Sequence, residues 1–265
     1  MSKSAQYEPK EISESGVLIT GGTSGVGLSA ALLYAKAGAR GIVVNGRNAE
    51  RGEQACAYVK EHYPQANIKF IAGDCNTESG ADDVCNAAWD FLSGVDILVN
   101  STVGLAGPVL LKDIPVPEIQ GIIFDQVMAP MLTSRILLPM MSSNGGGAIV
   151  NIASDAGKTT TPGETVLGAA MAAIIMFTKA MAMETKRNGI RVNVLTPSVI
   201  EGTLTNQRMM TQEFAGKLFS KATQAAHLGV CVPEDLAKTI IFLTSPESSK
   251  ITGQAISVNG GISAA

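Results

Sequence analysis

The chain has 265 residues, of which 46% are hydrophobic and 16% charged, so it is long enough for one large α/β domain with a buried core. A net charge of −3 offers no basic surface to nucleic acid or anionic lipid, and neither is expected as a partner. The four cysteines form no CxxC pair and only two histidines exist, which argues against a metal and against a disulfide framework. We therefore expect a cytoplasmic protein.

The first residues are polar and include no apolar segment of the signal-peptide kind. We expect a flexible leader over residues 1–14 and a single domain over residues 15–265. The longest apolar run, residues 166–177, spans 12 residues and is too short to cross a bilayer. No membrane contact is expected.

Apolar, β-branched runs alternate with helical patterns along the whole chain. The expected strands lie at 16–20, 41–45, 68–73, 95–100, 147–153, 191–195 and 255–258. The expected helices cover 25–37, 49–62, 81–91, 118–141, a segment containing Leu167, and 233–243, and loops are expected over 203–220. The strands are continuously apolar, which is typical of parallel strands buried on both faces. The sequence predicts an α/β, single-domain Rossmann fold: a doubly wound parallel sheet with helices on both faces.

A glycine-rich stretch, TGGTSGVG at 20–27, follows the first expected strand and opens the first expected helix. Its glycines allow a tight turn and a close approach of the backbone to a pyrophosphate, whose charge a helix N-terminus holds. This context indicates a dinucleotide site rather than a plain connector. The expected cofactor contacts in the turn are Gly21, Thr23, Ser24, Gly25, Val26 and Gly27.

The second expected strand ends in NGR at 45–47. An acid near this position holds the ribose of NAD, whereas an arginine accommodates the extra phosphate of NADP. No acid occurs here before Glu50. Arg47, with help from Ser24 and Asn45, therefore predicts NADP(H) as the cofactor.

With these features the sequence resembles the short-chain dehydrogenase/reductase family over nearly its whole length. The matching segments are the glycine turn, GDC at 73–75, DILVN at 96–100, GAIVNIASDAG at 147–157, NGIRVNVLTPS at 188–198 and the C-terminal stretch at 233–261. The resemblance implies an oxidoreductase with Ser154 as the catalytic serine. It implies further cofactor contacts at Asp74, Cys75, Asn100, Pro197, Val199, Ile200 and Thr203.

The departures from the family pattern are as informative as the matches. In the family a tyrosine follows the serine by 13 residues and a lysine follows four later, which leads here to Leu167 and Met171. The helical asparagine of the family corresponds to Gln126, and its NNAG motif to NSTV at 100–103. By this resemblance only Ser154 of the catalytic tetrad remains.

The family's tyrosine gives a proton to the alkoxide formed in carbonyl reduction, and its lysine lowers the pKa of that tyrosine. An iminium ion needs no such acid, because hydride addition gives a neutral amine directly. Apolar Leu167 and Met171 suit a cationic acceptor if an anion lies nearby, and Asp155 or Glu164 could supply it. The plainer alternative is that both acids are solvated loop carboxylates, and that Ser154 bonds local backbone rather than substrate.

This pattern resembles the unusual short-chain reductases of fungal prenylated indole alkaloid pathways, which combine NADPH-dependent iminium reduction with control of an intramolecular Diels-Alder cyclisation. We expect a small but bulky hydrophobic substrate from secondary metabolism, in a pocket rich in adaptable methionine. The candidate methionines are Met128, Met131, Met171, Met176, Met209 and Met210, and the plainer alternative is that most of them are ordinary core residues. The alternative is a catalytically inactive pseudoenzyme with a regulatory or structural role, although the retained turn, Arg47 and Asp74 favour the enzyme.

The expected helices at 118–141 and 165–187 carry more apolar and small residues than one sheet contact needs. In the family the corresponding helices form subunit interfaces. We therefore expect a homodimer or a homotetramer.

Overall fold

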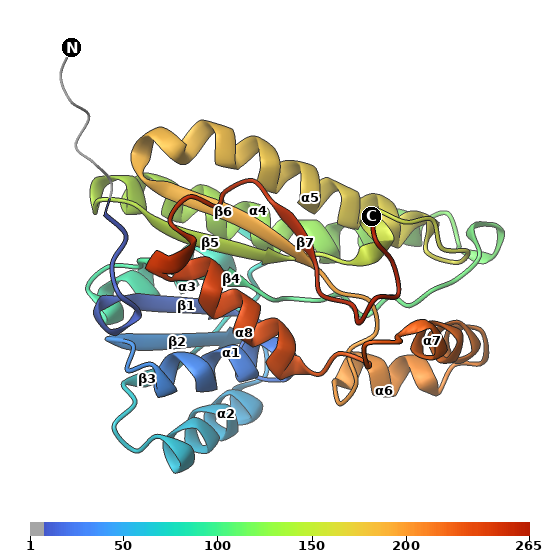
Figure 1. The fold of residues 1–265 in the computed structure, drawn as a ribbon, viewed down its shortest axis with the longest axis horizontal. Helices are drawn as coiled ribbons and strands as arrows, with labels where there is room; N and C mark the ends of the chain where they lie inside the picture. The colour runs from blue at the N-terminus through green and yellow to red at the C-terminus, as the bar shows by residue number, and fades with distance from the viewer. Residues whose placement is uncertain (1–7) are drawn as a thin grey trace.

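The computed structural model describes residues 8–265, which form a sheet of seven parallel strands in the order β3-β2-β1-β4-β5-β6-β7 (Figure 1). The strands are β1 (Gly16–Thr20), β2 (Gly41–Gly46), β3 (Ile68–Ala72), β4 (Ile97–Asn100), β5 (Gly147–Ile152), β6 (Ile190–Thr196) and β7 (Ala255–Ser257). The predicted fold, a doubly wound parallel sheet in one Rossmann domain, is confirmed.

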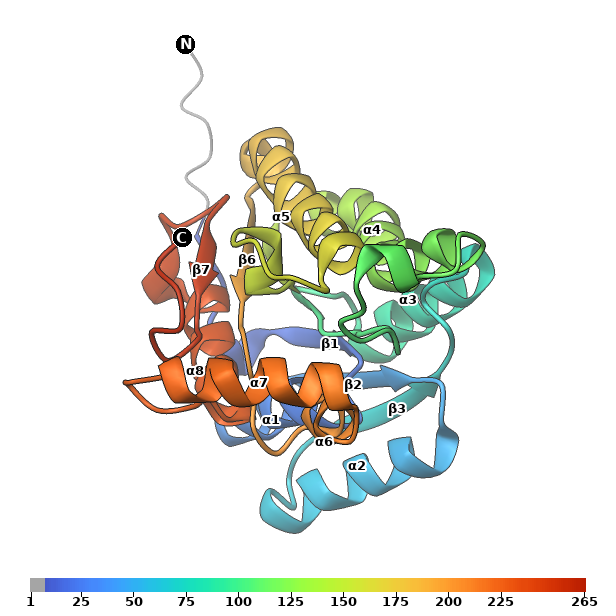
Figure 2. The same ribbon diagram turned by 90° about the vertical axis from the view of Figure 1, so that its right-hand side faces the viewer.

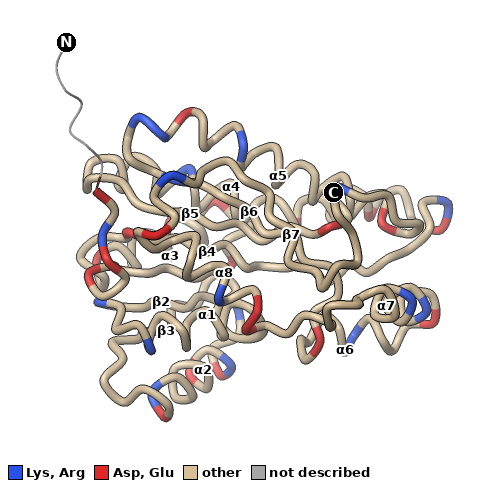
Figure 3. Tube along the Cα trace, viewed as in Figure 1, with Lys and Arg blue, Asp and Glu red and all other residues tan. Residues whose placement is uncertain are grey.

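Helices cover both faces of this sheet. The helices are α1 (Gly25–Lys36), α2 (Ala49–His62), α3 (Glu78–Leu92), α4 (Glu118–Ser143), α5 (Thr165–Thr185), α6 (Leu204–Met210), α7 (Glu213–Ala225) and α8 (Pro233–Thr244). Successive strand residues point to opposite faces, so Val17 and Ile19 pack under α1, α2 and α8, whereas Leu18 packs under α3, α4 and α5. Charged residues gather on the surrounding helices and loops, and most strands carry none (Figure 3).

Two helical stretches, Glu118–Ser143 and Thr165–Asn188, are long and apolar enough to cross a membrane by length and composition alone. In this structure α4 and α5 lie side by side on one face of the sheet (Figure 1). Apolar side chains such as Leu137 and Ile174 are buried there. Packing in the core thus accounts for much of their hydrophobicity.

Two parts of the chain differ from the sequence-based expectation. Helix α3 begins at Glu78 rather than near residue 81, because the Thr77 hydroxyl accepts a hydrogen bond from the Gly80 amide (3.2 Å) and caps the helix earlier. The stretch expected as loops contains α6 and α7, which lie where the strands end (Figures 1 and 2). Helix α7 buries only Ala215 fully, and its larger apolar side chain Phe214 is exposed, so it packs loosely on the domain.

The first seven residues of the predicted leader lie outside the described part of the chain. The remainder of it contacts the domain: Ile12 is buried, and Lys10 Nζ lies 2.6 Å from Asp96 Oδ1. The side chain of Asp96 also accepts a hydrogen bond from the amide of Gly16 at the start of β1 (2.9 Å). Residues 10–12 are therefore packed against the amino-terminal end of the sheet.

Candidate active site

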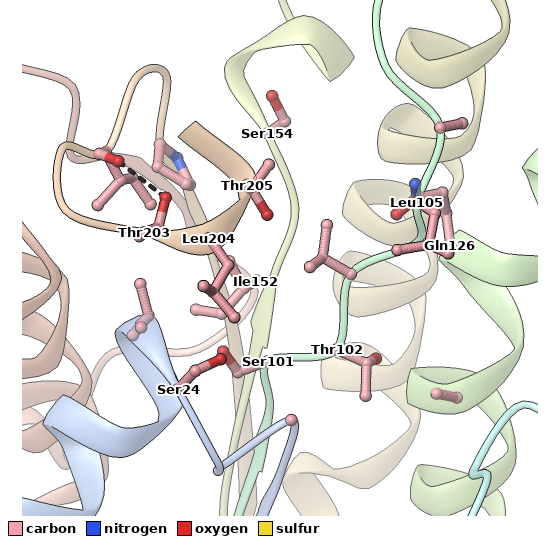
Figure 4. Close-up of a pocket in the computed structure, with 18 of the residues that line it drawn as sticks. Ser24, Ser101, Thr102, Leu105, Gln126, Ile152, Ser154, Thr203, Leu204 and Thr205 are labelled. Carbon is pink, nitrogen blue, oxygen red and sulfur yellow. Dashed lines mark hydrogen bonds between the residues drawn. The ribbon is translucent and has the colours of Figure 1, made fainter. Parts of the chain in front are cut away.

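A cavity of about 390 Å³ runs along the carboxyl ends of the strands, where ligands bind in open α/β sheets. It has two parts. We call the part lined by the β1–α1 turn and the ends of β2 and β3 the cofactor half. We call the part lined by residues 101–108, 152–174 and α6 the substrate half. Figure 4 shows Ser24 at one side of the cavity and Leu105 and Gln126 at the other.

The β1–α1 turn has the geometry that a pyrophosphate requires. Gly21 (φ +65°) and Gly25 (φ +52°) adopt left-handed conformations, and both line the cavity. The side chain of Ser24 makes no capping hydrogen bond to α1, so the amides of the first turn remain available to an anion. A Cβ atom at Gly27 would lie 2.5 Å from Gly21 O, so helix and turn meet only because residue 27 is glycine.

Arg47 lies at the end of β2, where the extra phosphate of NADP is expected. Its Nη1 atom is 3.6 Å from Asp74 Oδ2 in an exposed pair that contributes little to stability. Arg51, which the sequence interpretation missed, lines the same part of the cavity from the first turn of α2. Its nearness to Arg47 in the sequence was the available signal. Two cations thus line this end of the cavity.

Asn45 and Cys75 shape the cavity wall, but their polar atoms are already paired. Asn45 Nδ2 donates to Ile71 O (3.0 Å) and Gly73 O (3.1 Å), and Asn45 Oδ1 accepts from Cys75 Sγ (3.2 Å). Burial raises the pKa of the Cys75 thiol to about 12. Asn45 therefore positions the end of β3 and leaves the phosphate to the arginines.

Three predicted cofactor contacts do not line the cavity: Gly27, Asn100 and Val199. Asn100 is buried in the sheet, where Nδ2 donates to Asn151 Oδ1 (2.9 Å) and Oδ1 accepts from the Thr133 hydroxyl (2.9 Å). Its role is to join β4 to β5 and α4. The predicted contacts that do line the cavity are Gly21, Thr23, Ser24, Gly25, Val26, Asn45, Arg47, Asp74, Cys75, Pro197, Ile200 and Thr203.

Ser154 and Asp155, the predicted catalytic residues, point to different places. Ser154 lines the cavity, and its Oγ accepts from the Ala156 amide (3.2 Å), which leaves the hydroxyl proton free to donate. Asp155 is only 3% exposed and does not line the cavity. Its Oδ2 accepts from Asn259 Nδ2 (3.2 Å) and from the Ser263 hydroxyl, so its carboxylate belongs to the C-terminal segment. Close by, Lys158 Nζ donates to Ala265 O (2.6 Å).

Glu164 is the acid that the structure brings to the cavity. Burial raises the pKa of its carboxyl, the Thr161 hydroxyl lowers it, and the nearby Asp155 carboxylate raises it again. The preceding Gly163 (φ +88°) lies directly against the ring of Phe214 on α7, and its carbonyl accepts from the Val109 amide (2.7 Å). Glu164 is thus held at a covered edge of the substrate half.

Leu167 and Met171 lie one turn apart on α5, and both line the cavity. Of the six candidate methionines only Met171 and Met209 do so. Met128 and Met131 pack in the core, whereas Met176 and Met210 are exposed. The apolar lining also includes side chains that sequence reasoning had not selected, among them Val103, Leu105, Pro108, Ile174, Leu204 and Phe219.

Gln126 is buried and lines the cavity from α4, and its Oε1 accepts from the Gly104 amide (3.2 Å). The Gly104 carbonyl accepts from Arg208 Nη2 on α6 (3.3 Å). Residues 101–108 are thereby held between α4 and α6. Arg208 was also missed, because α6 itself was not expected.

The fold and the cavity define a dinucleotide-binding α/β protein. A sequence model of the short chain dehydrogenase family matches residues 15–213, and the chain belongs to this family of oxidoreductases. A 3-oxoacyl-acyl-carrier-protein reductase of Chlamydia trachomatis is 33% identical over 250 residues, which are 92% of this chain and 96% of the relative.

Two solved structures are similar throughout. A short chain oxidoreductase from Pseudomonas aeruginosa, NADPH bound and described as containing an atypical catalytic center, is 25% identical with a TM-score of 0.87, and the match covers 97% of this chain and 100% of that one. L-Sorbose reductase from Gluconobacter frateurii, complexed with NADPH and L-sorbose, is 31% identical with a TM-score of 0.83, and the match covers 94% and 97% of the two chains.

Proposed function

We propose that the chain is an NADP(H)-dependent reductase whose hydride acceptor is an iminium ion, or an imine that is already protonated when it binds, in a bulky hydrophobic secondary metabolite. The observation that carries this proposal is the pair Leu167 and Met171, which line the cavity at the spacing from Ser154 where the family resemblance expects a tyrosine and a lysine. A hydrocarbon and a thioether donate no proton. An acceptor that is already cationic requires none.

NADP(H) suits the cofactor half on two grounds. The glycine turn leaves helix amides free for a pyrophosphate, and Arg47 and Arg51 lie at the position of an extra phosphate. The predicted cofactor also agrees with the NADPH present in the two solved relatives, one of them 31% identical. When bound, NADPH supplies the hydride.

The residues of the substrate half would then act on the acceptor without moving a proton. Leu167 and Met171 exclude water below it, and an ionised Glu164 stabilises its positive charge in an apolar surrounding. The hydroxyl of Ser154 donates to a polar group of the substrate and fixes its orientation. We include in the proposal that these apolar walls guide a later intramolecular cyclisation of the Diels-Alder type.

Carbonyl reduction with Glu164 as the acid is the second candidate. Burial raises the pKa of this carboxyl, and a protonated Glu164 at the cavity wall has a proton to give to an alkoxide. The substitution Glu164→Gln separates the two candidates. If Glu164 is the acid, the substitution abolishes ketone reduction. If Glu164 instead stabilises an iminium, the substitution lowers the affinity for the iminium more than it lowers the rate of hydride transfer.

The test begins with fluorescence titrations of the protein with NADPH and NADH, followed by NADPH consumption with N-methyldihydroisoquinolinium and with a ketone of similar size. Tight binding that favours NADPH, together with turnover of the iminium alone, supports the proposal. Binding without turnover of either compound points to the pseudoenzyme. No binding of either nucleotide removes hydride transfer from consideration.

Restoring the expected pair provides a sharper test. The double variant Leu167→Tyr, Met171→Lys would place an acid and a cation where a cationic acceptor lies. We expect no gain in iminium turnover, with NADPH affinity showing that the variant is folded. A clear gain would refute the proposal.

We also propose that the protein is a cytoplasmic homodimer or homotetramer. Exposed apolar side chains lie on α4 and α5, the helices expected at the interface: Ile123, Phe124, Met176 and Met183. Light scattering at low concentration checks this, and a monomer mass would contradict it.

A further inference from the structure

The substrate half contains two ionisable side chains among its described lining residues, Glu164 and Arg208. The rest of that lining is apolar or carries uncharged polar groups such as Ser154, Thr205 and Gln126. Glu164 was considered above as the partner of a cationic acceptor. Arg208 has no part in that proposal, and its presence in an apolar cavity requires a reason.

Arg208 reaches from α6 to the opposite wall. Its Nη2 donates to Gly104 O (3.3 Å), and Gly104 N in turn donates to Gln126 Oε1 (3.2 Å). Figure 4 shows Leu105, which follows Gly104, together with Gln126 on the side of the cavity away from Ser24 and the glycine turn. The guanidinium is therefore anchored in the substrate half, away from the arginines of the cofactor half.

The guanidinium of Arg208 makes fewer hydrogen bonds and ion pairs within the described residues than its N–H donors allow. Arg208 forms no ion pair with a carboxylate of residues 8–265, and its Nε is buried without a hydrogen-bond partner there. A guanidinium stays charged at any physiological pH and presents five donors in a planar fork. A buried donor without an acceptor is costly, so an oxyanion that enters the cavity gains from this side chain.

We propose that Arg208 binds a carboxylate of the substrate. The inference rests on the proposed function for the cationic centre and narrows it, since the substrate becomes an iminium ion that also carries an acidic group. Glu164 and Arg208 then contact opposite charges of one molecule. The same guanidinium chemistry also fits a phosphate of the cofactor, and the test below separates these two sources.

The segment between the two groups limits how far apart they lie. Gly104 bonds to Arg208, and Val109 bonds to Gly163, the residue before Glu164. The five residue steps from Gly104 to Val109 span at most about 18 Å even when fully extended, which sets the upper limit between those two backbone anchor points. A molecule of several rings with an iminium and a carboxylate at opposite ends meets this requirement.

The test uses NADPH-loaded protein and two probes of nearly equal size, phenylpropanoate and phenylpropanamide, with affinities from calorimetry. We expect the wild type to bind the carboxylate at least tenfold tighter than the amide. Arg208→Met keeps the apolar stem and should remove this preference, and Arg208→Lys should retain part of it. Arg187→Met changes an exposed arginine in the turn before β6, at the end of the sheet opposite the cavity, and is the matched control that should change nothing.

Equal affinity of the wild type for the two probes, no measurable binding of the carboxylate, or a preference that survives in Arg208→Met overturns the inference. A loss of NADPH affinity in Arg208→Met of tenfold or more also overturns it and assigns the side chain to a cofactor phosphate. Neither probe accepts hydride. Failure of the iminium assay therefore tests the proposed function separately from this result.

Discussion

The cofactor half and the substrate half share one cavity, but they are built in different ways. In the cofactor half the pyrophosphate contacts come from backbone, and only the extra phosphate is left to side chains: Gly21, Gly25 and the first turn of α1 approach a ligand because a side chain there would collide or strain. In the substrate half the contacts come from side chains on α4, α5 and α6, brought together by bonds such as Arg208 to Gly104. Backbone contacts are the same for every residue type, so they hold one kind of ligand in one position. Side-chain contacts change with each substitution, so the substrate half can bind a different ligand while the fold stays constant.

The largest expected effect comes from disturbing the backbone half. Gly27→Ala places a methyl group 2.5 Å from Gly21 O, so α1 must move away from the turn. We expect NADPH affinity to fall at least about 100-fold, about 2.7 kcal/mol, in a fluorescence titration. Gly121→Ala is the control, since a Cβ there meets no atom within 4 Å. Equal affinity in both variants would show that the turn is not the cofactor site.

Arg47→Ala tests a side chain within the cofactor half. We expect a loss of NADPH affinity of about 10- to 100-fold, or about 1.4 to 2.7 kcal/mol, with little change for NADH. The pair with Asp74 is exposed, so the free energy of unfolding should stay nearly constant. A fall in affinity for both nucleotides would contradict the assignment of Arg47 to the extra phosphate.

In the substrate half, Glu164→Gln should change how the free energy of unfolding depends on pH. Burial raises the folded-state pKa of Glu164 above its unfolded value, so the folded state holds this proton over a pH window in which the unfolded chain has lost it. The stability of the wild type should therefore fall as pH rises through that window. The Gln variant should be more stable above the window and equal below it, as measured by urea unfolding at several pH values.

Two comparisons make the Glu164 result specific. Glu184→Gln, at an exposed position on the same helix, should leave the pH profile of unfolding unchanged. Affinity for N-methyldihydroisoquinolinium should rise several-fold with pH in the wild type and stay flat in Glu164→Gln. A flat profile in the wild type would remove Glu164 as the partner of a cation.

The smallest effect is expected outside both halves. Tyr34 is fully buried between α1 and α8, and its hydroxyl lies 2.9 Å from Thr244 Oγ1. Tyr34→Phe should lower the free energy of unfolding by about 1 kcal/mol. NADPH affinity should not change. A large change in affinity would mean that general stability, rather than the turn and Arg47, sets binding.

The same contrast explains what the sequence could predict. Runs such as GVLIT and GIVVN identify buried parallel strands, and a glycine turn after the first strand has one common use, so most residues predicted to contact the cofactor do line the cavity. The substrate half depends on the direction of single side chains. The sequence interpretation favoured Asp155 over Glu164 as the anion, but the carboxylate of Asp155 bonds to Asn259 and Ser263 and does not line the cavity. Arg208 could be recognised as a cavity residue only once the structure showed helix α6.

The bonds of the C-terminal segment have a practical consequence for anyone who prepares this protein. Asp155 and Lys158, which follow Ser154 closely, form hydrogen bonds with Ser263 and Ala265, so residues 263–265 stabilise the loop that carries Ser154. An affinity tag fused after Ala265 would disturb these hydrogen bonds. A low activity measured with such a fusion would then describe the tag rather than the enzyme, and a tag at the other terminus is the safer choice.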